Sequence, residues 1–235
     1  MISKAFLFAL VGGSVICATA ADTDPKAEIG AAIASLSGKP NYSWVARSKS
    51  EGSAASARSA PTEGKAEKDG YTYFKLTMGD NTVEAALKGP KSVIKTEADW
   101  ESSQDLKGDG AWIARRLSAF KAPVAEAQDL LAKVKALKKE RGGAYSGDLT
   151  EVGARELLFA RSREAQVRWP TGSKGWVKFW IKNGVLTQYE YNLQGRVAGQ
   201  NQQEHEVNRT TTVEIKSIGS TKVQIPEEAK KKLGP

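Results

Sequence analysis

The sequence predicts an α+β protein whose main element is an antiparallel β-sheet. Short runs of alternating apolar and polar residues recur along the chain, separated by turn residues, which is typical of antiparallel strands. The clearest run is GWVKFWIKNGVLTQYEY at 175–191. Its Asn183-Gly184 pair indicates a type I′ hairpin, because both residues tolerate positive φ. Helical spacing of apolar residues occurs near the start, in the middle and at the end of the chain.

The first half of the chain predicts a helix followed by a meander. Asp24 and Pro25 favour a helix start and Gly38 a helix stop, so we expect a short amphipathic helix between them. Residues 41–50 alternate as a strand. The Ser-, Ala- and Gly-rich stretch 52–62 lacks periodicity and predicts a flexible insert. Strands are expected at 71–78, 82–88 and 92–96, with Trp100 closing the meander.

The middle of the chain predicts helices at 109–120 and 123–140. In the second, Lys135, Lys138 and Lys139 would lie near the negative end of the helix dipole, which favours a structural role for this basic cluster over anion binding. Asp148, with Glu151 three residues on, is expected to cap a further helix that runs through Ala160.

Strands resume in the last third of the sequence. They are expected at 165–169, in the hairpin, at 209–217 and at 222–225, before a short basic helix that ends at Leu233. In the hairpin, Trp176 and Trp180 share one face of the strand, while Val177 and Phe179 share the other. Two largely apolar faces predict a mid-sheet strand covered on both sides. On this stretch alone, a plain buried strand is favoured over a lipid-lined surface.

The N-terminus predicts export. Lys4 precedes an apolar run at 5–16, and Ala18-Thr19-Ala20 supplies the small residues of a signal-peptidase site, so 1–21 is expected to be a signal peptide. Residues 22–235 are then one domain in the periplasm or outside the cell. Lipid anchoring at Cys17 is disfavoured because Ile16 is branched, and cleavage leaves a chain without cysteine. No later run approaches the ~20 apolar residues of a transmembrane helix.

The distribution of charge along the sequence argues against binding to nucleic acid. The chain has 35 basic and 27 acidic residues and a net charge of +8. The basic residues are spread along the sequence, so envelope polymers and anionic headgroups are better candidate partners than nucleic acid, and solubility alone is the favoured explanation.

The sequence lacks the usual groups for catalysis. His205 is the only histidine and lies in a polar stretch, where a solvated surface residue is favoured over a catalytic base. We therefore expect that the protein is not an enzyme and has no catalytic residue and no cofactor. A metal site built from His and Cys is excluded by the number of ligands, whereas a calcium site built from oxygen ligands is not excluded. An exported hydrolase using paired carboxylates, Asp105 with Asp109 or Glu204 with Glu206, is the least favoured hypothesis. The six tryptophans fit core packing, an acyl groove or stacking on sugars.

Several short stretches resemble a known family. They are Asp69-Gly70-Tyr71, Asp99-Trp100, Asn183-Gly184-Val185-Leu186 followed by Tyr189, and IGSTKVQIPEEA at 218–229. With the order of elements, they resemble the LolA-like half-barrel superfamily of exported lipid- and lipoprotein-binding proteins, which includes proteins of the LolA, LppX–LprG and RseB types.

The resemblance implies a strongly curved antiparallel sheet, a half-barrel, wrapped over a few helices. It also implies an apolar cavity that holds the acyl chains of a lipid or an acylated protein, as in a lipoprotein carrier. The alternative is an envelope sensor or interaction module of the same fold, with a protein partner and a cavity filled by its own side chains. For each candidate lining residue, an ordinary core position is the favoured alternative. Strand alternation gives these candidates: Trp44, Phe74, Leu76, Val83, Val177, Phe179, Ile181 and Leu186.

Overall fold

The computed structural model describes most of the chain after the predicted signal peptide. The described residues are 24–51, 60–68, 70–78, 81–97, 99–108, 111–161, 169–198 and 203–234. The predicted signal peptide, Cys17 and positions 52–59 of the predicted insert lie outside them.

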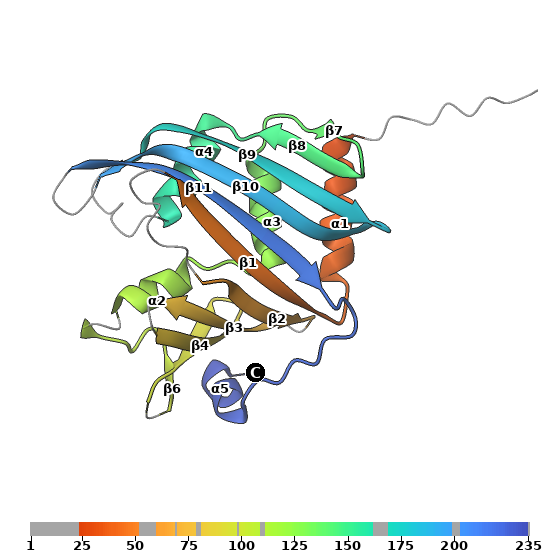
Figure 1. Cartoon of the computed structure of the whole chain (residues 1–235). Helices are drawn as coiled ribbons and strands as arrows, with labels where there is room; N and C mark the ends of the chain where they lie inside the picture. Colours follow the sequence, from red (N-terminus) through yellow and green to blue (C-terminus); the bar gives the residue numbers. More distant parts are fainter. Residues whose placement is uncertain are drawn as a thin grey trace, which may run out of the picture.

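One antiparallel sheet of eleven strands runs through the described part of the chain (Figure 1). Its order is β6-β5-β4-β3-β2-β1-β11-β10-β9-β8-β7, so two meanders meet where β1 pairs with β11. The sheet is open and curved, as the LolA-like resemblance implies. The strands are β1 (Asn41–Glu51), β2 (Thr62–Glu67), β3 (Tyr71–Met78), β4 (Asn81–Lys88), β5 (Lys91–Lys95), β6 (Trp100–Ser102), β7 (Lys138–Lys139), β8 (Ala144–Asp148), β9 (Thr171–Lys182), β10 (Val185–Ala198) and β11 (Glu204–Lys216).

Helices cover the concave face of this sheet. They are α1 (Pro25–Ser37), α2 (Ala111–Ser118), α3 (Pro123–Lys133) and α4 (Glu151–Arg161). In Figure 1, α1 and α3 lie behind β9 and β10, and α2 lies beside β3. The side chain of Asp24 caps α1 by accepting a hydrogen bond from the Lys26 N–H at 3.2 Å, and the helix buries Ile29, Ala32, Ile33 and Leu36. The expected first helix is therefore confirmed.

A fifth helix, α5 (Glu227–Leu233), covers the opposite, convex face near one end of the sheet. Its buried Ala229 and Leu233 belong to a small apolar cluster with Val93 and Trp100. Strands β3 to β5 therefore contribute apolar side chains to both faces, because the main core lies on one side and α5 on the other.

The central hairpin forms as the sequence predicts. Asn183 and Gly184 connect β9 to β10 with φ of 53° and 71°, which are the two positive values that a type I′ turn requires. Lys182 pairs with Val185 across the turn. The register of β10 and β9 is thus set locally.

The predicted helix at 123–140 is too long. Helix α3 ends at Lys133, and Val134 is already extended at φ −78° and ψ 141°. The Lys135 N–H donates to the Asp148 carbonyl at 2.8 Å, and the Thr150 N–H donates to the Lys133 carbonyl at 2.8 Å. These bonds draw the chain toward β8 and end the helix. Lys135, Lys138 and Lys139 therefore lie beyond the helix end, and the dipole explanation of this basic cluster is wrong.

Two smaller predictions also need correction. Helix α4 is capped by Thr150, whose hydroxyl accepts a hydrogen bond from the Gly153 N–H at 3.0 Å, while Asp148 ends β8. Residues 222–225 form no strand, and Ile225 instead packs in the cluster beneath α5. The sequence analysis also missed β2, β7 and β8. Of the strand expected at 165–169, only Trp169 is described, and it lies outside any strand.

Strand β9 has two strand neighbours, but only one of its faces is covered in the described structure. Val177 and Phe179 are fully buried in the core on the concave face. Trp176 and Trp180 point to the convex face, where both are partly exposed and belong to neither apolar cluster. No helix of the described structure packs on Trp176 or Trp180, so of the covers expected for the second face (a helix, a cavity or a partner) the helix is not found there, and a partner stays a prediction.

Among the described residues, no helix combines the length and apolar character needed to cross a membrane.

The turn geometry gives a first prediction. Asn183→Ala places a residue with a Cβ and no local side-chain hydrogen bond at φ 53°, so we expect the free energy of unfolding to fall by about 1 kcal/mol. The control is Asn183→Gly, which adopts this backbone without strain. Urea unfolding that gives equal midpoints for the two variants would contradict the assignment of strain to this position.

Candidate functional site

The predicted lining residues all belong to one apolar layer between the concave face and the helices. Trp44, Phe74, Leu76, Val177, Phe179 and Leu186 are buried members of the main core cluster, and Val83 and Ile181 pack against it. They come from both meanders, so the β1–β11 junction brings them into one layer. Strand alternation thus assigned each of them to the correct face.

This layer is filled by the protein's own side chains. Phe74, Val177, Phe179 and Leu186 are completely buried, and Trp44 retains 2% of its surface exposure. A completely buried side chain has no adjoining space that a water molecule enters. In this conformation the layer is a packed core at these positions.

Part of this filling comes from the segment between α2 and α3. The Phe120 ring stacks on Phe74 with ring centroids 4.3 Å apart and an interplanar angle of 12°. It also lies 5.8 Å from the Trp44 ring. Leu117 of α2 is buried in the same cluster. Phe120 is the last residue of the helix predicted at 109–120, and the sequence analysis gave it no place in the core.

The Trp44 indole lies against the backbone of the neighbouring strand. Gly64 of β2 pairs with Trp44, and a Cβ at Gly64 would collide with three atoms of the indole ring. The indole Nε1–H is buried and donates no hydrogen bond within the described structure. A buried donor without an acceptor costs about 1–3 kcal/mol, so this position would gain from an acceptor.

A second polar group lies in the same layer, beneath β10. The Tyr189 hydroxyl donates to Glu126 Oε2 at 2.6 Å, and the Tyr191 hydroxyl donates to Glu126 Oε1 at 3.3 Å. Glu126 lies in the first turn of α3, where the helix dipole favours a carboxylate. These bonds tie α3 to the sheet. The sequence analysis did not predict this contact, because it joins residues more than sixty positions apart.

Burial also affects Tyr42, which precedes Trp44 on the same face of β1. Desolvation raises the pKa of Tyr42 to about 12, although a hydrogen bond with the Val124 backbone works in the opposite direction. The neutral phenol is therefore the form that this layer accommodates.

The groups considered for catalysis lie elsewhere. His205 starts β11 with Glu204 and Glu206, and all three are exposed. Asp105 is exposed, and Asp109 lies outside the described residues. Within the described ranges, no group of three or more His, Cys, Asp or Glu side chains is arranged to hold a metal ion.

Two surface hollows lie outside the apolar layer. They open at the convex face over β8 to β11, with volumes of about 330 Å³ and 770 Å³. None of the predicted lining residues contributes to either hollow.

The structure is similar to two solved structures at low sequence identity. The structure of LprF from Mycobacterium bovis matches 87% of this chain and 97% of its own, with 11% identity and a TM-score of 0.42. A LolA superfamily protein from Nitrosomonas europaea matches 85% of this chain and 94% of its own, with 7% identity and a TM-score of 0.34. No protein-family model and no curated protein matches the chain. Both TM-scores lie below 0.5, so the LolA-like resemblance stays a prediction from the sequence.

The close approach of Gly64 to Trp44 gives a second prediction. Gly64→Ala displaces the indole from its place against β2, so we expect the free energy of unfolding to fall by about 1–3 kcal/mol. The matched control is Gly30→Ala in α1, where the nearest atom to a new Cβ is 3.9 Å away and alanine stabilises the helix by about 0.5–1 kcal/mol. If thermal unfolding shows both variants stabilised, the packing described for Trp44 is wrong.

The buried Tyr42 phenol gives a prediction for high pH. Above the ordinary pKa of 10, the unfolded chain loses this proton while the folded protein retains it up to about pH 12. The free energy of unfolding therefore falls by about 1.4 kcal/mol for each pH unit over that window. Tyr42→Phe should remove this part of the alkaline loss, measured by urea unfolding between pH 9 and 12. Parallel pH profiles for the two proteins would contradict the burial of the phenol.

Proposed function

We propose that this chain is an exported binding protein for acylated molecules, and that its apolar layer opens to hold acyl chains. The ligand class is a lipid or an acylated protein. Export rests on the predicted signal peptide at 1–21, and places the protein in the periplasm or outside the cell. The protein acts by binding, without chemistry on its ligand.

The observation that carries this proposal is the buried Trp44 Nε1–H, which has no acceptor among the residues that the structure describes. It lies next to the ring of Phe120, which does not come from the sheet. An ester or amide carbonyl at the head of an acyl chain is an acceptor of the required kind. The acyl chain of the ligand would take the place of the Phe120 ring, which stacks on Phe74. The ligand would thus satisfy the indole and keep the layer apolar.

The energies favour long acyl chains. Removing a Phe side chain from the core costs about 1.5–3 kcal/mol, and each buried CH₂ returns about 0.8 kcal/mol. About two to four methylene groups therefore offset the displacement of Phe120, which is partly buried, and further methylene groups provide net affinity. We expect short-chain acids to bind poorly and chains of palmitoyl length to bind well.

A second function is supported by a different observation. Phe74, Val177, Phe179 and Leu186 are completely buried, as expected for a module whose layer stays filled by its own side chains. Such a protein would work as an envelope sensor or interaction module through a protein partner. The two functions differ in whether acyl ligands enter.

Lipid extraction tests the first function. Mature protein purified without detergent should yield acyl lipid in organic extracts, detected by mass spectrometry. In titrations with fluorescent acyl probes of increasing length, Phe120→Ala should bind palmitoyl-length probes about tenfold more tightly than the wild type, because the ligand no longer displaces the ring. Phe159→Ala is the matched control, since Phe159 stacks on Trp169 and belongs to neither apolar cluster.

The result against this proposal is equally defined. If wild type and Phe120→Ala are both folded, carry no lipid and bind no acyl probe of any length, the layer is a closed core. The interaction module then becomes the better explanation.

A further inference from the structure

The convex face of the sheet carries a continuous row of polar side chains. Strand register places Glu51 of β1 beside Asn208 of β11, Asn208 beside Gln194 of β10, and Gln194 beside Lys174 of β9. The next row across the sheet contains Thr210, Asn192, Trp176 and Asp148. This surface lies on the opposite side of the sheet from the apolar layer.

The two hollows on this face adjoin each other. The smaller is lined by Asp148, Lys174, Trp176, Asn192 and Gln194, among others, and the larger extends from Lys174 and Gln194 to Glu51 and Asn208. Lys174 and Gln194 belong to both. The distance from β9 to β1 is about 14 Å at normal strand spacing, so the hollows form one groove across the strands.

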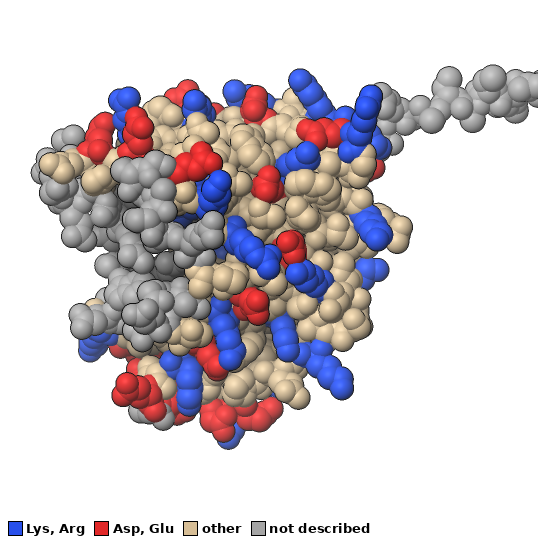
Figure 2. All heavy atoms as spheres, in the orientation of Figure 1, with Lys and Arg blue, Asp and Glu red and all other residues tan. Residues whose placement is uncertain are grey.

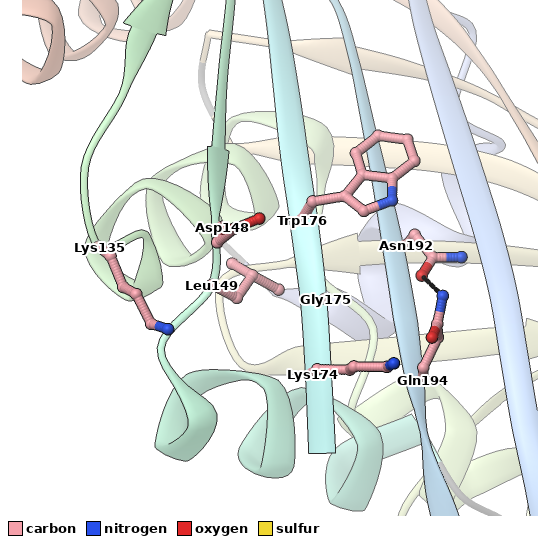
Figure 3. Close-up of a pocket in the computed structure, with 8 residues that line it drawn as sticks. All are labelled: Lys135, Asp148, Leu149, Lys174, Gly175, Trp176, Asn192 and Gln194. Carbon is pink, nitrogen blue, oxygen red and sulfur yellow. Dashed lines mark hydrogen bonds between the residues drawn. The ribbon is translucent and has the colours of Figure 1, made fainter. Parts of the chain in front are cut away.

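An aromatic ring and fixed amides meet at one end of this groove. Figure 3 shows the Trp176 ring extending from β9 above Asn192, with Lys174 and Gln194 on the same face. Asn192 is 4% exposed, and its Nδ2 donates to Asn208 Oδ1 at 2.8 Å and to Thr210 Oγ1 at 3.0 Å. Its Oδ1 accepts a bond from Gln194 Nε2 at 3.0 Å. The amides are therefore held in place before any ligand arrives.

The charges around the groove are mixed. The Asn208 Nδ2 donates to Glu51 Oε2 at 3.0 Å. Arg196 Nε lies 3.7 Å from Glu206 Oε1 and forms an ion pair with it. Lys174 and Asp148 have no ion pair within the described structure. Basic and acidic side chains are interspersed over this view of the molecule (Figure 2). A surface of this kind does not select a polyanion, which requires a single-sign basic patch.

We propose that this groove binds an uncharged oligosaccharide. A pyranose ring presents an apolar C–H face that packs on an indole, and hydroxyl groups that both donate and accept hydrogen bonds. The partly exposed Trp176 provides the first surface, and side-chain amides and carboxylates provide the second kind of partner. The groove crosses from β9 to β1, which suits a chain of sugar units rather than one. This site does not depend on the proposed acyl binding.

Strand β9 supplies a matched control for this proposal. Trp180 lies on the same face as Trp176, four residues further along the strand, and lines neither hollow. Both indoles are partly exposed, so replacing either should leave the fold intact. A general loss of surface aromatic area would affect the two variants equally, whereas a site at the groove would not.

The test is calorimetric titration of the mature protein with chitotetraose, maltotetraose and cellotetraose. We expect at least one to bind, with affinity reduced about tenfold or more by Trp176→Ala and reduced several-fold by Gln194→Ala. Trp180→Ala should bind as the wild type does. High salt should have little effect, because the ligand is uncharged.

A second arm identifies the source of the sugar. Vesicles with and without a glycolipid that carries the preferred sugar report whether a membrane headgroup is bound, and the soluble oligosaccharide reports a free or polymeric glycan. Binding in either arm that depends on Trp176 supports the proposal. Failure of all three oligosaccharides to bind would overturn it, as would equal losses in Trp176→Ala and Trp180→Ala.

Discussion

The pairing of β1 with β11 is the contact on which the rest of the molecule depends. These strands come from opposite ends of the described chain, and their register sets Trp44 opposite Ile215 and Ala46 opposite Val213. Without this ladder, the two meanders would each have an unpaired edge and half of an apolar face. With it, one curved sheet presents a continuous concave surface to α1, α2 and α3. The apolar layer on the concave face and the groove on the convex face both cross this junction.

The two faces of the sheet have different chemistry. On the concave face, complete burial of residues such as Phe74 and Phe179 provides stability, and the Trp44 indole N–H is a buried donor with no acceptor among the described residues. On the convex face, cross-strand amide bonds such as Asn192 to Asn208 stabilise a wet sheet. A protein that binds an acylated ligand inside and a glycan outside would use both sides of one sheet without competition between them.

The sequence predicted what local rules decide. Asn183-Gly184 determined the hairpin, and the alternation of Val177, Phe179 and Ile181 assigned their face. It failed where distant partners decide. The Asp148 carbonyl, rather than any breaker residue, ends the helix predicted at 123–140. Phe120 enters the core through contacts with Trp44 and Phe74 on strands distant in sequence. The convex row depends on register between strands far apart in sequence, which alternation within one strand does not reveal.

The central claim is that the apolar layer opens at Trp44 to admit an acyl chain. Its most direct test is the indole N–H spectrum of protein labelled with nitrogen-15, in which the Trp44 signal is assigned by its loss in Trp44→Phe. We predict that a palmitoyl ester shifts this signal downfield and slows its hydrogen exchange, since the carbonyl accepts its hydrogen bond. If the Trp44 signal stays unchanged at a saturating concentration of the palmitoyl ester, the claim is contradicted.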